Sequence, residues 1–229
     1  MTGEMYNRKV QKQWFWLAMI SGLGALLSYL IPTQIPFNNM VNPILFIFFG
    51  FFLILFVVSL FRLINDGYSR VSTTVGTLLL TLAGCTHSIM AAMQASLRAE
   101  LPDFRAAFGT DNSEALSVMV SGLSSIQIGV DFAFDLFISA GVIFWSAAFW
   151  RHTRVGKVVC IAGILIALTG FSFNLIAFPD NPGRHGLMDP GALFGAWFTV
   201  VWVWILVVYQ KHVSTGKGPS SFLKTSDIH

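Results

Sequence analysis

The chain has 229 residues, of which 55% are hydrophobic, 14% aromatic and only 11% charged, with a formal net charge of +3. An average soluble domain is about 25% charged, so this composition excludes a soluble globular domain, a disordered chain and a disulfide scaffold. It indicates an integral membrane protein with many spans. The only two cysteines, Cys85 and Cys160, stand alone in apolar runs and form no zinc or redox pair.

Six apolar stretches are each long enough to cross a hydrocarbon core about 30 Å thick, which takes about 20 helical residues. We expect all six to be helical, because an open strand leaves backbone groups unsatisfied in lipid. The expected spans are 14–31, 43–61, 72–95, 128–150, 158–178 and 190–209. The predicted fold is therefore all-α, a single bundle of six transmembrane helices at 14–209, with terminal segments 1–13 and 210–229 outside the membrane and a flexible tail.

The basic residues predict the orientation. Eleven of the 14 Lys and Arg residues lie at the two termini, after the second span and after the fourth span, and three lie on the other side. The positive-inside rule then places both termini in the cytoplasm, as expected for a multi-pass protein of the plasma (inner) membrane. Basic clusters beside apolar runs favour membrane lipid as a partner and do not favour nucleic acid.

The segment 96–127 between the third and fourth spans is too long for a simple connector. Apolar residues recur in it at helical spacing, and a start resembling a capping box precedes the second set. We expect amphipathic helices lying on the outer surface, either as a packed interfacial element or as a lid. The apolar positions are Leu101, Phe104, Phe108, Leu116, Met119, Val120 and Leu123.

Ionisable groups inside a span are costly and are candidates for function. His87, Asp131 and Asp135, together with Asn174, are expected at depths of roughly 5–12 Å from the outer end of their spans. Four polar groups from three spans at similar depth predict one pocket that opens outward. Further ligand-binding candidates are Ser139 on the same face as the two carboxylates, Trp197 in the sixth span and Asp189 at its start.

The chemistry of this predicted pocket stays open. Two carboxylates four residues apart on one helical face repel each other when both are ionised. A shared proton, the charge of His87 or a bound cation has to offset this repulsion. Asp131, Asp135 and His87 are therefore catalytic candidates as acids or bases and candidate ligands of zinc, iron or manganese. The alternative is that these polar groups only bond across helices. The cofactor is not determined by the sequence.

Part of the chain resembles a known group of proteins. An N-x-x-x-F-P pattern begins at Asn174 and a G-L-x-D-x-G pattern at Gly186, and the regions around Gly129–Asp135 and Phe149–His152 add to them. These roughly 100 residues resemble small bacterial integral membrane proteins of uncharacterised function. The resemblance implies a helical bundle of the bacterial inner membrane and brings no activity or site residues.

Three functions fit these observations. The first is binding or transport of a small lipophilic or protonatable molecule through the outward-facing polar pocket. The second is a membrane-embedded enzyme that acts on a lipid-like substrate through the aspartates or a metal. The third is a structural or assembly subunit. Motifs of small residues such as Gly84-x-x-x-Ser88 are expected to pack helices within the chain, although an oligomer is also compatible with them.

Overall fold

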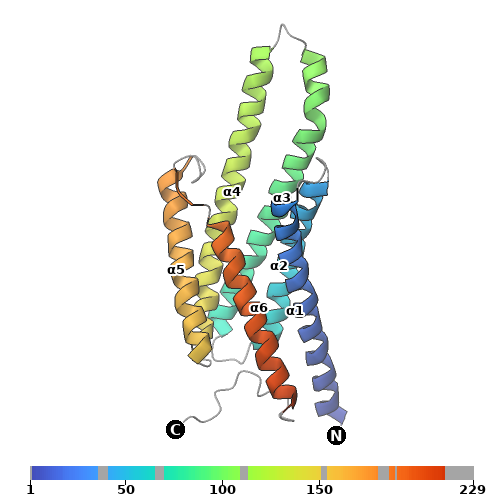
Figure 1. Ribbon diagram of the computed structural model, residues 1–229, viewed down its shortest axis with the longest axis vertical. Coiled ribbons are helices and arrows are strands. Elements are labelled where there is room, and N and C mark those ends of the chain that lie inside the picture. The colour runs from blue at the N-terminus through green and yellow to red at the C-terminus, as the bar shows by residue number, and fades with distance from the viewer. Residues whose placement is uncertain are drawn as a thin grey trace.

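The computed structural model describes residues 2–35, 41–64, 70–108, 113–150, 154–179, 186–188 and 190–214. These residues form six helices and no strand (Figure 1). The helices are α1 (Thr2–Gln34), α2 (Val41–Ile64), α3 (Arg70–Phe108), α4 (Ser113–Phe149), α5 (Arg154–Ala177) and α6 (Gly191–Ser214). The tail 215–229 and Asp189 lie outside the described residues.

All six helices contain an apolar segment long enough to span a membrane, so the prediction of an all-α integral membrane protein with six spans is confirmed. Helices that follow each other in the chain pack side by side, and α6 meets α1 to close the bundle. Helix α1 begins and α6 ends at the same end of the bundle, and α3 ends and α4 begins at the opposite end (Figure 1). We call these the terminal end and the hairpin end.

Helices α3 and α4 project beyond the other four at the hairpin end (Figure 1). The expected amphipathic pattern is present, because Leu101, Phe104 and Phe108 on α3 and the predicted apolar positions on α4 are half-buried between exposed neighbours. The arrangement differs from the expectation. The helices are not separate elements on the surface at 96–127 but continue the third and fourth spans. The apolar residues of each extension lie on the same helix face as the apolar residues of the span that it continues. In an antiparallel pair these two faces can cover each other. A helix that lies flat on the membrane does not need this alignment.

Small residues bring the backbones of α2, α3 and α4 close together. A side chain at Gly50 of α2 would collide with the backbone oxygen of Gly84 and with Ser88, and the Ser88 hydroxyl donates a hydrogen bond to the Ile47 backbone oxygen (2.9 Å). Gly76 of α3 and Gly141 of α4 form a similar contact. The motif Gly84-x-x-x-Ser88 therefore packs helices within the chain, as expected.

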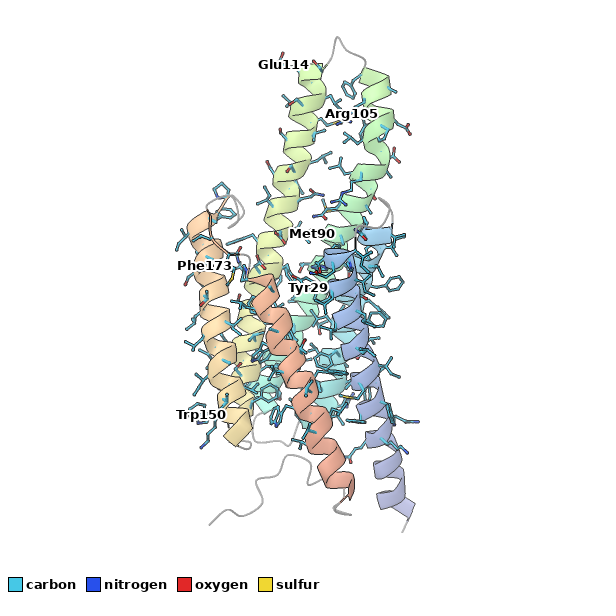
Figure 2. The ribbon with its side chains drawn as sticks, viewed as in Figure 1. Tyr29, Met90, Arg105, Glu114, Trp150 and Phe173 are labelled. Atoms are coloured by element: carbon cyan, nitrogen blue, oxygen red, sulfur yellow. The ribbon has the colours of Figure 1, made fainter. Side chains whose placement is uncertain are left out.

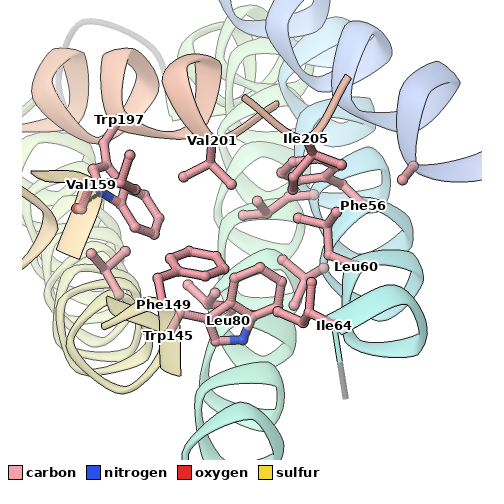
Figure 3. Packing of buried hydrophobic residues seen from close by; sticks show 14 of the residues in the cluster. Phe56, Leu60, Ile64, Leu80, Trp145, Phe149, Val159, Trp197, Val201 and Ile205 are labelled. Carbon is pink, nitrogen blue, oxygen red and sulfur yellow. Dashed lines mark hydrogen bonds between the residues drawn. The ribbon is translucent and has the colours of Figure 1, made fainter. Parts of the chain in front are cut away.

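Helix α6 is held by large aromatic residues instead. Trp197 and Trp204 are buried, and Figure 3 shows Trp197 beside Val159 of α5 and near Phe149 of α4. The indole Nε1 of Trp197 donates to the Val159 backbone oxygen (2.9 Å), and the Nε1 of Trp202 donates to the Met19 backbone oxygen of α1 (3.2 Å). These two bonds tie α6 to both of its neighbours.

The contact at Gly50 can be tested with a matched pair of substitutions. Gly50→Ala places a methyl group against the backbone of α3 and should lower the free energy of unfolding by about 1–3 kcal/mol. Gly129→Ala adds the same methyl group at a position of α4 where no atom of a neighbouring element lies within 4 Å. This substitution should raise the free energy of unfolding by about 0.5–1 kcal/mol. Unfolding in detergent followed by circular dichroism measures both. Equal effects of the two substitutions would show that the α2–α3 contact is not tight.

Candidate functional site

A cavity of about 80 Å³ lies inside the bundle, between α1, α2, α3, α4 and α6. It is closer to the hairpin end, since Tyr29 near the end of α1 and Gly191 at the start of α6 both line it. Figure 2 shows Tyr29 at about the level where α6 begins. The aromatic residues that line the cavity are Tyr29, Phe49, Phe56, Phe134, Phe194, Phe198 and Trp202.

His87 of α3 lines this cavity and is only 7% exposed. Its ring packs against Phe49 (4.7 Å between ring centroids), Phe134 (5.0 Å) and Phe46 (6.2 Å). Among the described residues neither Nδ1 nor Nε2 has a hydrogen-bond partner of ordinary geometry, although the Phe46 backbone lies near the ring. Since the Phe46 backbone can take at most one ring nitrogen, the other nitrogen of this buried imidazole can form a hydrogen bond with a molecule in the cavity.

Two other polar side chains of the cavity wall already donate hydrogen bonds to backbone oxygens. The Thr199 hydroxyl donates to the Gly195 backbone oxygen of its own helix (2.8 Å), and the Trp202 indole donates to Met19. No Asp, Glu, Lys or Arg stands among the residues that line the cavity, all of which belong to the described part of the chain. His87 and the phenol of Tyr29 are the two acid–base groups of this wall.

The predicted carboxylates do not join His87 in the cavity. Asp131 and Asp135 are half-buried on α4, and both interact with neighbouring groups. The α4 residues that face the cavity are Phe134 and Ile138. Asp135 and Ser139 each follow one of these by one position, which is a rotation of about 100° around the helix. Asp131 precedes Ile138 by seven positions, so it lies on nearly the same side of α4 but nearer the hairpin end, and it is not part of the cavity wall. The common pocket of His87 and the two carboxylates stays a prediction.

The other predicted ligand-binding residues have different surroundings. Ser139 is completely buried, and its hydroxyl has no partner among the described residues, but it does not line the cavity. Asn174 is buried and its Nδ2 donates to the Gly170 backbone oxygen within α5 (2.9 Å). Trp197 is buried and bonded to Val159, away from the cavity wall. Asp189 lies outside the described residues.

No metal centre is assembled in the described part of the chain. Nowhere in it do three His, Cys, Asp or Glu side chains come close enough to hold an ion. His87, Asp131 and Asp135 are all described, so the structure does not bring the predicted trio together as metal ligands.

A separate crevice of about 350 Å³ lies between α4 and the end of α5. It is lined by Ser121, Ser124, Ser125, Ile128, Gly129, Phe178 and Pro179.

Sequence reasoning found His87 but missed the aromatic wall around it. The wall does have a sequence signal, since Phe49, Leu53 and Phe56 on α2 follow the i, i+4, i+7 spacing, and Phe194, Phe198 and Trp202 on α6 recur every four residues. The same spacing is the ordinary pattern of a helix that packs against a core. It could not distinguish a cavity wall from a filled core.

Comparison of the chain with protein-family models, with curated proteins and with solved structures found no match.

The lack of an ordinary hydrogen-bond partner for His87 among the described residues predicts an effect on stability. Replacing the imidazole by a phenyl ring in His87→Phe removes a buried polar group without a partner and should raise the free energy of unfolding of the ligand-free protein by about 1–3 kcal/mol. Thr86→Val is the matched control on the same helix, because the Thr86 hydroxyl is bonded to the Ala83 backbone oxygen (2.9 Å). This variant should show no gain. A clear loss of stability in His87→Phe would mean that the imidazole is satisfied.

Proposed function

We propose that this integral membrane protein binds a small lipophilic molecule in the cavity between α1, α2, α3, α4 and α6, and that His87 forms the one polar contact with it. The observation that carries the proposal is a 7% exposed imidazole in a cavity whose wall is mostly apolar; among the described residues its ring nitrogens have no hydrogen-bond partner of ordinary geometry. Ligand sites are typically concave and mostly apolar, with few polar groups that fix the orientation.

The energetics favour such a ligand. An unsatisfied buried polar group costs about 1–3 kcal/mol, and a ligand with a single polar atom removes this cost when it binds. A neutral imidazole offers one N–H donor and one nitrogen acceptor, so it can serve a hydroxyl or a carbonyl group. The aromatic wall contributes the burial of apolar surface that a lipophilic molecule needs.

Binding is supported over catalysis by what stands next to His87. General acid–base chemistry on a bound molecule needs a positioned acid and base within hydrogen-bond reach of the reacting group. Phe49 and Phe134 are the rings closest to His87, and the α4 carboxylates are not part of the wall. A single imidazole between phenyl rings is suited to forming a hydrogen bond with a polar atom of a ligand. It is less suited to catalysis, which needs one group to give a proton and another to accept one.

The proposal predicts a molecule that copurifies with the protein. Protein extracted from its native membrane with mild detergent should carry a small molecule at near-stoichiometric amounts, detected by native mass spectrometry. His87→Phe should retain about tenfold less of it, because one hydrogen bond to the ligand is lost. Thr86→Val should retain it as the wild type does. Equal loading of the wild type and His87→Phe, or no ligand in either, would contradict the proposal.

We further propose that the hairpin end faces the outside of the cell and that both termini are cytoplasmic, as the distribution of basic residues favours. Two exposed valines allow a test, namely Val118 in the α3–α4 hairpin (68% exposed) and Val71 near the terminal end (76%). In a background with both cysteines replaced by alanine, Val118→Cys should react in intact cells with a thiol reagent that cannot cross membranes. Val71→Cys should react only after permeabilisation. The reverse pattern would invert the orientation.

A further inference from the structure

A cation–π contact joins α1 and α2 near the terminal end of the bundle. Arg62 is the only charged residue of α2, and its guanidinium carbon lies over the Trp14 ring of α1, 5.6 Å from the ring centroid. From this contact and its surroundings we infer that Arg62 binds the phosphate of an anionic phospholipid at the surface of the membrane. The site is separate from the cavity, because neither Arg62 nor Trp14 lines the cavity.

The position of Arg62 along α2 matches the depth of a lipid phosphate. The helix from Val41 to Arg62 is about 32 Å long, and a hydrocarbon core is about 30 Å thick. A helix that begins at one surface of the core therefore brings Arg62 to the other surface. Trp16 (54% exposed) and Trp150 (50%) lie towards the same end of the bundle. Exposed tryptophans are typical of the boundary between hydrocarbon and headgroups.

The contact with Trp14 leaves the donors of the guanidinium free for a ligand. A cation–π contact uses the flat face of the group, whereas its N–H donors lie in the plane. Among the described residues, none accepts a hydrogen bond from Arg62 or forms an ion pair with it. A planar guanidinium fixed in this way can bind two oxygens of one phosphate through parallel hydrogen bonds.

The charges near this end also favour an anion. Lys12 of α1 and Lys157 of α5 are exposed there. Each basic side chain near the surface strengthens the attraction to anionic lipid about fivefold. The acidic side chains that the structure describes all lie on α3 and α4, and the nearest in sequence to the terminal end is about 20 Å before the end of α4. They are Glu100, Asp103, Glu114, Asp131 and Asp135.

The apolar surface of the two helices favours a lipid over a free phosphate ion. Towards the hairpin end, α1 exposes Leu23 (43%) and Leu27 (44%), and α2 exposes Phe48 (46%) and Phe51 (51%). The acyl chains of a lipid whose phosphate is bound by Arg62 can cover this surface. A free phosphate ion gains nothing from it.

Lipid titration followed by native mass spectrometry tests the site. The full chain in one detergent is titrated with dioleoyl phosphatidylglycerol, which is anionic, and with dioleoyl phosphatidylcholine, which has the same acyl chains and no net charge. The wild type should bind the anionic lipid at least about fivefold more tightly. Arg62→Gln should abolish most of this preference. Arg105→Gln, which removes an exposed arginine from the projecting part of α3, should keep it.

Substitution of Trp14 separates the orientation of the guanidinium from its charge. Trp14→Leu keeps Arg62 but removes the ring, and it should weaken binding of phosphatidylglycerol roughly two- to fivefold. Trp14→Phe keeps an aromatic face and should weaken binding less. Thermal unfolding followed by circular dichroism shows whether each variant keeps the fold of the wild type.

Three results would overturn the inference. The first is an unchanged lipid preference in Arg62→Gln, and the second is an equal loss of preference in Arg105→Gln. The third is displacement of phosphatidylglycerol by an excess of inorganic phosphate at constant ionic strength, which would make the site one for the free ion. Full binding of phosphatidylglycerol by a folded Trp14→Leu variant would remove the role of the ring.

Discussion

The close backbone contact of α2 and α3 at Gly50 and Gly84 is the constraint on which the rest of the structure depends. Lipid tails are as apolar as the helices, so helix association in a membrane relies on close packing and on hydrogen bonds between helices rather than on the hydrophobic effect. The bond from Ser88 to the Ile47 backbone oxygen supplies both at one place. It sets the rotation of α3, and the contact of Gly76 with Trp145 and the Gly141 backbone then places α4 on the other side of α3.

The opposite side of the bundle is built on another principle. Helix α6 meets its neighbours through tryptophan and phenylalanine side chains, and the indole nitrogens of Trp197 and Trp202 are satisfied by backbone oxygens of α5 and α1. Rigid rings fixed by hydrogen bonds cannot adjust to fill every space. A bundle with small residues on one side and large rings on the other therefore leaves a cavity where the two meet, and its wall is mostly aromatic.

His87 connects these two features. It precedes Ser88 in the sequence, so the contact that joins α3 to α2 also turns the imidazole towards Phe49 and the cavity. An unsatisfied buried nitrogen is tolerated there because the tight packing of α2, α3 and α4 outweighs its cost. The function proposed for the cavity follows from this placement, since a ligand with one polar atom satisfies the imidazole and fills the space.

The sequence by itself determined the properties that belong to one helix at a time. Hydropathy and length gave six spans, the spacing of Leu116, Met119 and Leu123 gave an amphipathic helix, and His87 was identified because an imidazole inside a span is costly. Tertiary structure decided how each helix is rotated. Phe134 and Ile138 face the cavity while Asp135 and Ser139 do not, and Asn174 bonds within its own helix. The depth of a residue along a helix can be counted from the sequence. The rotation of the helix about its axis is set by the packing of all its neighbours together, and a shift by one residue turns a side chain by about 100°.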